Sequence, residues 1–178
     1  MNWPAYKDES SYAQVAQRVI DENDITAKDV VGGSSLGGMV ALEVVKKTAA
    51  KQVVLIGSAV HSGEVQSMLS LLSPLAALTP MAIVQALVGK NKNLVSAMFA
   101  DSDPNFIRAM SLYLPSWPGF QSLNVTIYRV HGRKDHVIPC PSVACDIVEN
   151  AGHLIAITHF KEVAAFLERV RTEIESVN

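Results

Sequence analysis

The residues best suited to chemistry are a serine, an aspartate and a histidine that lie far apart in the sequence. Ser35 is the centre of Gly33-Ser34-Ser35-Leu36-Gly37, a G-x-S-x-G pattern. A serine hydroxyl is a weak nucleophile unless a base accepts its proton, and a carboxylate usually orients that base. His153 is the candidate base and Asp135 the candidate carboxylate. Their order along the chain, serine then aspartate then histidine, predicts nucleophilic catalysis on an α/β scaffold.

Each of these residues also has an ordinary structural interpretation. Ser35 is suited to capping a helix, Asp135 to a turn, and His153 to a satisfied position in the structure. The other four histidines are expected to be structural or solvated: His61, His131, His136 and His159. The alternatives are a substrate contact for His61 and a pocket position for His136. Asp101 and Asp103 are rival carboxylates, but their sequence is typical of a turn or helix start.

The elements around the candidate residues predict where they meet. Apolar runs indicate buried strands over 29–32, 52–57, 125–130 and 144–148, and periodic apolar positions indicate helices over 12–20, 36–48 and 160–177. Alternation of helices with buried strands predicts an α/β class with a mostly parallel sheet of about four strands. Ser35, Asp135 and His153 follow the first, third and fourth strands, so we expect all three at the carboxyl edge of the sheet.

Residues 61–120 break this alternation. They contain five prolines and short helical stretches over 81–88 and 106–113, which predicts a helical cap inserted after the second strand. We expect one domain over residues 1–178 that includes this cap. Some apolar cap residues are expected to pack together or, alternatively, to form an acyl pocket: Met68, Leu69, Leu72, Leu75, Met81 and Met98.

Three motifs resemble those of the α/β-hydrolase family: Val31 to Met39 around the serine, His131 to Pro139 around the aspartate, and Gly152-His153. The resemblance implies a three-layer fold with Ser35 as nucleophile, His153 as general base and acid, and Asp135 as the orienting acid. It also implies that the backbone N–H of Leu36 donates to the oxyanion. The resemblance includes a serine at position 35, in the turn between strand and helix that is called the nucleophile elbow. The dehalogenase and epoxide hydrolase branches of the family carry aspartate at this position, so the serine argues against them.

The chain departs from that family before the elbow. Only 34 residues precede Ser35, whereas members usually carry several strands and a loop that supplies a second oxyanion donor. We therefore expect a half-built oxyanion hole, whose loss of one donor costs about 10²- to 10³-fold in turnover. We also expect the first strand to be an edge, which pairs with a second copy in a homodimer or is covered by the N-terminal segment.

The length, charge and composition of the chain exclude some classes of binding partner. The chain has 178 residues and a formal net charge of −2 with a pI near 6.2, which argues against nucleic acid or an anionic membrane as a partner. The N-terminus does not resemble a signal peptide and no apolar run is long enough to span a membrane, so we expect a cytoplasmic protein. Cys140 and Cys145 form neither a disulfide framework nor a zinc pattern, and no metal or cofactor is implied.

These observations predict a serine hydrolase that acts on a small, fairly apolar ester or related acyl compound. The alternative is a weak or inactive remnant of this fold that binds a small molecule or a protein. A carbon–carbon hydrolase or a cofactor-free haloperoxidase would use the same three side chains.

Overall fold

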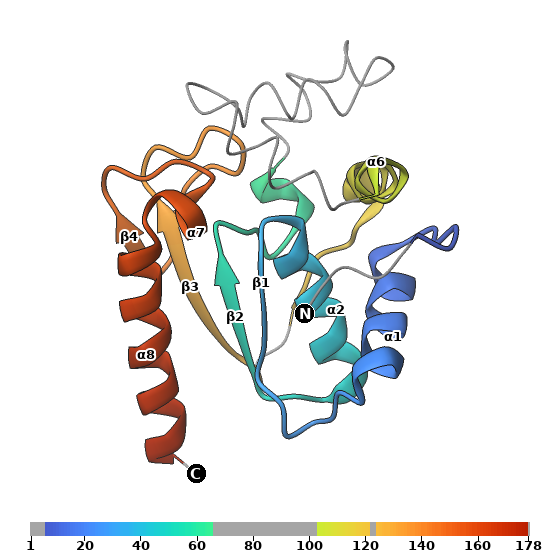
Figure 1. Cartoon of the computed structure of the whole chain (residues 1–178), viewed down its shortest axis with the longest axis horizontal. Helices are drawn as coiled ribbons and strands as arrows, with labels where there is room; N and C mark the ends of the chain where they lie inside the picture. The colour runs from blue at the N-terminus through green and yellow to red at the C-terminus, as the bar shows by residue number, and fades with distance from the viewer. Residues whose placement is uncertain (1–5, 66–102, 122–123, 178) are drawn as a thin grey trace.

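The computed structural model describes residues 6–65, 103–121 and 124–177. In these residues four strands form one sheet in the order β1-β2-β3-β4, and every neighbouring pair is parallel (Figure 1). The strands are β1 (Val31–Ser34), β2 (Gln52–Ile56), β3 (Thr126–Gly132) and β4 (Asp146–Val148). The predicted α/β class with a reduced parallel sheet is confirmed.

Helices cover both faces of this sheet (Figure 1). The α-helices are α1 (Tyr12–Asn23), α2 (Leu36–Thr48), α6 (Pro104–Tyr113), α7 (Ile155–Thr158) and α8 (Phe160–Val177), and the 3₁₀ helices are η1 (Ser62–Glu64) and η2 (Leu114–Ser116). Val53 and Leu55 of β2 face a cluster with α1, α2 and α6, while Val54 between them joins a second cluster with α8. Alternate residues of a buried strand therefore serve the two faces.

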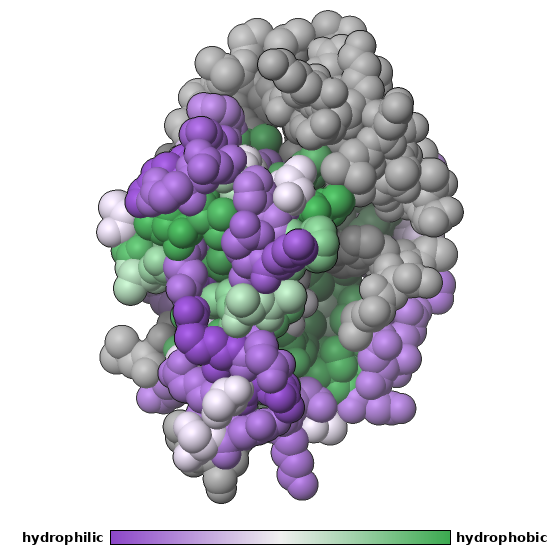
Figure 2. Space-filling view, turned by 60° about the vertical axis from the view of Figure 1, so that its left-hand side comes forward, coloured by the Kyte–Doolittle hydropathy of each residue, from purple (hydrophilic) through white to green (hydrophobic). Residues whose placement is uncertain are grey.

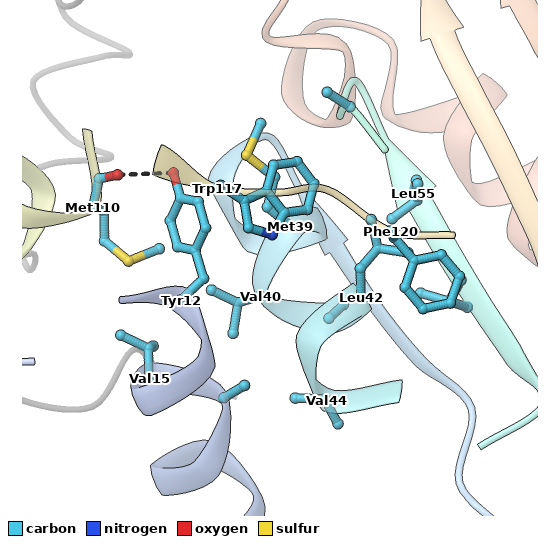
Figure 3. Close-up of a cluster of buried hydrophobic side chains, with 14 of the residues drawn as sticks. Tyr12, Val15, Met39, Val40, Leu42, Val44, Leu55, Met110, Trp117 and Phe120 are labelled. Carbon is cyan, nitrogen blue, oxygen red and sulfur yellow. Dashed lines mark hydrogen bonds between the residues drawn. The ribbon is translucent and has the colours of Figure 1, made fainter. Parts of the chain in front are cut away.

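In the larger cluster, α6 and the segment after it pack against α1 and α2. The Tyr12 hydroxyl donates a 2.8 Å hydrogen bond to the carbonyl oxygen of Met110, and the Tyr12 ring meets Trp117 edge-on at 5.8 Å (Figure 3). Trp117 Nε1 in turn donates to the buried Glu43 of α2. The region 103–120 thus packs in the same core as α1 and α2, although it was expected to be part of the cap.

Several predicted boundaries shift. The first strand was expected over 29–32 but runs over Val31–Ser34, because Asp29 accepts hydrogen bonds from Thr26 in a turn. The fourth strand begins at Asp146 rather than at residue 144, and the third continues to Gly132. The helices predicted over 36–48 and 160–177 are confirmed, whereas the one over 81–88 lies outside the described residues.

Strand β1 is the edge of the described sheet, as expected. A cavity of about 640 Å³ is bounded by β1, the end of α1 and α2, and its apolar lining includes Val19, Val31, Val40 and Val44. The strand that leads to Ser35 therefore lies beside a cavity.

The face shown in Figure 2 is mixed in polarity. Figure 2 turns forward the side of the molecule on which α8 and β4 lie in Figure 1, and hydrophilic residues there surround smaller hydrophobic areas. In the part of the chain that the structure describes, no helix is both long and apolar enough to cross a membrane.

Candidate active site

Ser35 occupies a sharp turn between β1 and α2. Its φ of 53° and ψ of −126° lie in a region that residues with a side chain rarely adopt. Although Ser35 stands at the N-cap position of α2, its side chain makes no capping hydrogen bond. The ordinary interpretation of Ser35 as a capping serine is therefore wrong.

Glycines around Ser35 permit this turn. A Cβ atom added to Gly33 would lie 2.2 Å from the backbone carbon of Gly37, because the strand and the helix that follows it approach closely. A Cβ added to Gly38 would lie 2.4 Å from Ser58 Oγ. A side chain at Gly33 would force the strand and helix apart, and one at Gly38 would displace Ser58, which explains a glycine at each of these positions.

Hydrogen bonds fix the backbone of the turn. The Ser35 N–H donates to the carbonyl oxygen of Ile56 at 3.1 Å, which continues the β1–β2 ladder. The Ser35 carbonyl oxygen accepts from the Gly38 N–H at 3.0 Å and from Ser58 Oγ at 2.7 Å. Together these contacts hold Ser35 in its strained conformation.

The three predicted side chains meet at the carboxyl edge of the sheet. Ser35 Oγ lies 2.8 Å from His153 Nε2, and His153 Nδ1 lies 2.8 Å from Asp135 Oδ2. Since an ionised carboxylate only accepts, Nδ1 carries the hydrogen and Nε2 is left to accept from the Ser35 hydroxyl. The His153 side chain is 6% exposed and that of Asp135 is fully buried. This arrangement can remove the proton from Ser35 and stabilise the resulting imidazolium.

Asp135 remains ionised in this buried position. Burial alone would raise the pKa of its carboxyl group, but hydrogen bonds from His131, His153 and the backbone of Ile138 outweigh burial and lower the pKa to about 2. Its Oδ1 accepts from the N–H groups of Val137 and Ile138 at 2.8 and 2.9 Å. Asp135 is therefore more than a turn residue, since it also contacts both histidines.

The backbone N–H of Leu36, the predicted oxyanion donor, stands at the start of α2. The first amides of a helix have no acceptor within the helix, and its dipole is positive at that end. The role of the Leu36 N–H as oxyanion donor therefore stays a prediction.

Most of the alternative histidines and carboxylates that the structure describes do not contact Ser35, His153 or Asp135. His136 is exposed, His61 lies 3.7 Å from Glu64, and His159 contacts the Thr158 hydroxyl. Asp103 caps α6 by accepting from the Asn105 N–H, as its sequence predicts, and Asp101 lies outside the described residues. Within residues 6–65, 103–121 and 124–177, no group of three or more metal-ligating side chains is arranged to hold an ion.

Sequence reasoning missed three residues that support the site. Ser58 holds the Ser35 carbonyl, and the buried Arg129 donates to the Ser58 carbonyl at 2.9 Å. Arg129 also pairs with Glu64 at 2.7 Å. His131, expected to be structural, lies 3.2 Å from Asp135. The available signal was the presence of Arg129 and His131 two residues apart in an otherwise apolar strand.

Comparisons with known proteins agree with this fold. No curated protein matches the chain in sequence. Its structure is similar to that of a thermophilic esterase from Thermogutta terrifontis, with 16% identity, a TM-score of 0.67, and coverage of 95% of this chain and 75% of that one. It also resembles a lipase-esterase related protein from Clostridium acetobutylicum, with 13% identity, a TM-score of 0.71, and coverage of 94% and 79%.

A third similar structure is a meta-cleavage product hydrolase from Pseudomonas fluorescens, with 16% identity, a TM-score of 0.59, and coverage of 95% of this chain and 75% of that one. At these identities the likeness concerns the fold. The sequence itself matches the model of the alpha/beta hydrolase family over residues 2–166. With that match along nearly its whole length, the chain belongs to the alpha/beta hydrolase family.

Proposed function

We propose that the chain is a serine hydrolase that cleaves a small, fairly apolar ester or related acyl compound. The observation that carries the proposal is the 2.8 Å contact between Ser35 Oγ and His153 Nε2 at a strained turn. The similarity to a thermophilic esterase and to a lipase-esterase related protein supports the same class of chemistry. The apolar character of the substrate rests on the Leu- and Met-rich sequence of 66–102, which lies outside the described residues.

In the first half-reaction Ser35 Oγ attacks the carbonyl carbon of the ester and its proton passes to His153 Nε2. The carbonyl oxygen becomes an oxyanion that faces the Leu36 N–H. His153 then gives the proton to the leaving alcohol oxygen, so that the carbon–oxygen bond breaks and an acyl-enzyme remains. Asp135 stays ionised throughout and stabilises the imidazolium.

In the second half-reaction water replaces the alcohol. His153 takes a proton from the water as its oxygen attacks the acyl carbon, and then returns the proton to Ser35 Oγ as the acid leaves. Both halves use one base, which alternates between accepting and donating a proton.

Labelling with a fluorophosphonate probe tests this proposal. We expect wild type to be labelled, and Ser35→Ala and His153→Ala to lose labelling. Ser34→Ala is the matched control, since Ser34 is the exposed neighbour of Ser35 and should leave labelling intact. Hydrolysis of short-chain esters should follow the same pattern. A folded wild type that neither labels nor hydrolyses esters would contradict the proposal and favour the binding protein considered as the alternative.

A further inference from the structure

Asp135 contacts a second imidazole besides that of His153. His131 projects from β3, its side chain is 1% exposed, and its Nε2 lies 3.2 Å from Asp135 Oδ2. The same Nε2 lies 2.8 Å from the carbonyl oxygen of Ile138. One imidazole nitrogen thus contacts both ends of the loop segment Asp135 to Ile138.

The position of the hydrogen on His131 follows from these neighbours. The Asp135 carboxylate and the Ile138 carbonyl both accept, so Nε2 carries a hydrogen that they share. Among the described residues His131 Nδ1 has no hydrogen-bond partner, and a proton there would be buried without an acceptor. The geometry therefore assigns the hydrogen to Nε2.

With His131 in place, both oxygens of the Asp135 carboxylate are occupied. Oδ1 accepts from two backbone N–H groups, and Oδ2 accepts from His153 Nδ1 at 2.8 Å and from His131 Nε2 at 3.2 Å. Rotation of the carboxylate would break several of these bonds together. The orientation of Oδ2 toward His153 is thereby fixed from β3 as well as from its own loop.

We propose that His131 is a positioning residue of the Ser35 site, which holds Asp135 Oδ2 toward His153 and shares the charge of that oxygen between two imidazoles. This rests on the proposed function. Without His131 the Asp135 carboxylate loses the contact from β3, so that Oδ2 is held toward His153 less firmly.

The other charged groups near His131 and Asp135 have partners of their own or are exposed to solvent. Arg129, two residues earlier on β3, is paired with Glu64. Lys134 and His136, the chain neighbours of Asp135, are exposed, and Lys134 donates to Asn150. His131 and His153 are therefore the titratable side chains in the described residues that contact the Asp135 carboxylate.

Two variants of His131 distinguish the loss of its hydrogen bond to Asp135 from the loss of its volume. His131→Gln keeps an N–H donor near the position of Nε2, whereas His131→Met fills similar space without a donor. His136→Met is the matched control, because that histidine is exposed and adjacent to Asp135 in the sequence. With a short-chain ester we expect kcat of His131→Met to fall about tenfold or more with KM little changed, because Asp135 Oδ2 is no longer held toward His153. The Gln and control variants should keep the wild-type kcat. An equal kcat in all four proteins would overturn the proposal.

Two measurements need no turnover. In a ¹³C carboxyl NMR titration we expect the pKa of Asp135 to be about 2 in wild type and higher in His131→Met. In wild type itself, ¹⁵N NMR should find the hydrogen of His131 on Nε2, which requires no variant to fold. A hydrogen on Nδ1 alone, or an unchanged Asp135 titration in the Met variant, would overturn the proposal. Inactivity of wild type would instead refute the proposed function and leave these two results standing.

Discussion

The Ser58 hydroxyl donates a 2.7 Å hydrogen bond to the carbonyl oxygen of Ser35. Ser58 is 1% exposed and follows β2, so a neighbouring strand end supports the turn that presents Ser35. The bond satisfies a carbonyl in a strained backbone conformation, and the Gly38 N–H is its other donor. The position of Ser35 Oγ thus depends on a side chain that never contacts a substrate in the proposed mechanism.

We predict that Ser58→Ala lowers kcat/KM for a short-chain ester about fivefold, since a buried carbonyl loses one donor of about 1 kcal/mol and the turn relaxes. Steady-state kinetics with circular dichroism as a folding check measures this. Ser176→Ala is the matched control, because Ser176 Oγ donates to the Glu173 carbonyl at 2.7 Å on exposed helix α8. Equal rates in both variants would show that the Ser58 bond does not position the nucleophile.

A second prediction concerns the close approach of β1 and α2. Gly33→Ala would place a Cβ atom 2.2 Å from the backbone of Gly37, and backbone cannot move aside as a flexible side chain can. We expect a loss of more than about 3 kcal/mol in the free energy of unfolding, or no folded protein.

Gly152→Ala is the comparison for that substitution. Its Cβ would lie 3.5 Å from the Lys134 carbonyl oxygen, an ordinary contact, although Gly152 adjoins His153. Urea unfolding should find this variant close to wild type. If Gly33→Ala were as stable as Gly152→Ala, the steric account of the G-x-S-x-G glycines would be wrong.

The sequence predicted the meeting of Ser35, Asp135 and His153 because of one geometric property. Each residue follows a strand, and the carboxyl ends of parallel strands lie at one edge of the sheet. The motifs identified which residue after each strand to choose, and the buried apolar runs identified the strands. The fold class and the three side chains of the candidate site could therefore be predicted from the sequence. The predicted ends of the strands differ from the observed ends by up to two residues.

The residues that hold the candidate site in place, namely Ser58, Arg129 and His131, were harder to predict from the sequence. The contact between Ser58 and Ser35 depends on how closely β2 and α2 approach, and no local periodicity encodes that distance. Arg129 and His131 lie on one side of β3 and are both buried, although polar and charged side chains are seldom buried unless they have partners. Their partners, Ser58 and Asp135, come from two different loops, so only the three-dimensional arrangement shows why β3 tolerates them.

A third prediction concerns acid stability. The pKa of Asp135 is about 2 in the folded chain, because hydrogen bonds from the histidines outweigh the effect of burial, against about 3.9 for an unperturbed aspartate. The ionised carboxylate therefore stabilises the fold above pH 4, and this contribution, about 2.5 kcal/mol, is lost as the pH falls from 4 to 2. Asp135→Asn has no such titration.

Urea unfolding of both proteins at several pH values measures the effect. The stability of wild type relative to Asp135→Asn should fall between pH 4 and pH 2 and be constant from pH 5 to 6. A difference that is independent of pH over the acid range would contradict the lowered pKa of Asp135.

The last prediction concerns the edge of the sheet at β1. Within the described residues this strand pairs with β2 alone, and the 640 Å³ cavity beside it is lined by valines and by polar residues that include Asn23 and Asp29. Val30, at the start of this edge, is 43% exposed. An unpaired strand edge is a template for another strand, and two-fold pairing of identical edges is the commonest closure. We therefore predict that a second copy pairs at β1 and that the chain is a homodimer.

Sedimentation equilibrium should give twice the chain mass for wild type at micromolar concentration. Val30→Lys places a charge at the edge, where lysine opposes strand pairing, and should shift the protein toward monomer. Val143→Lys is the matched control, since Val143 is 59% exposed in the loop before β4 and should leave the dimer intact. A monomeric wild type would contradict the predicted homodimer, and dissociation by the Val143 change alone would place the interface elsewhere.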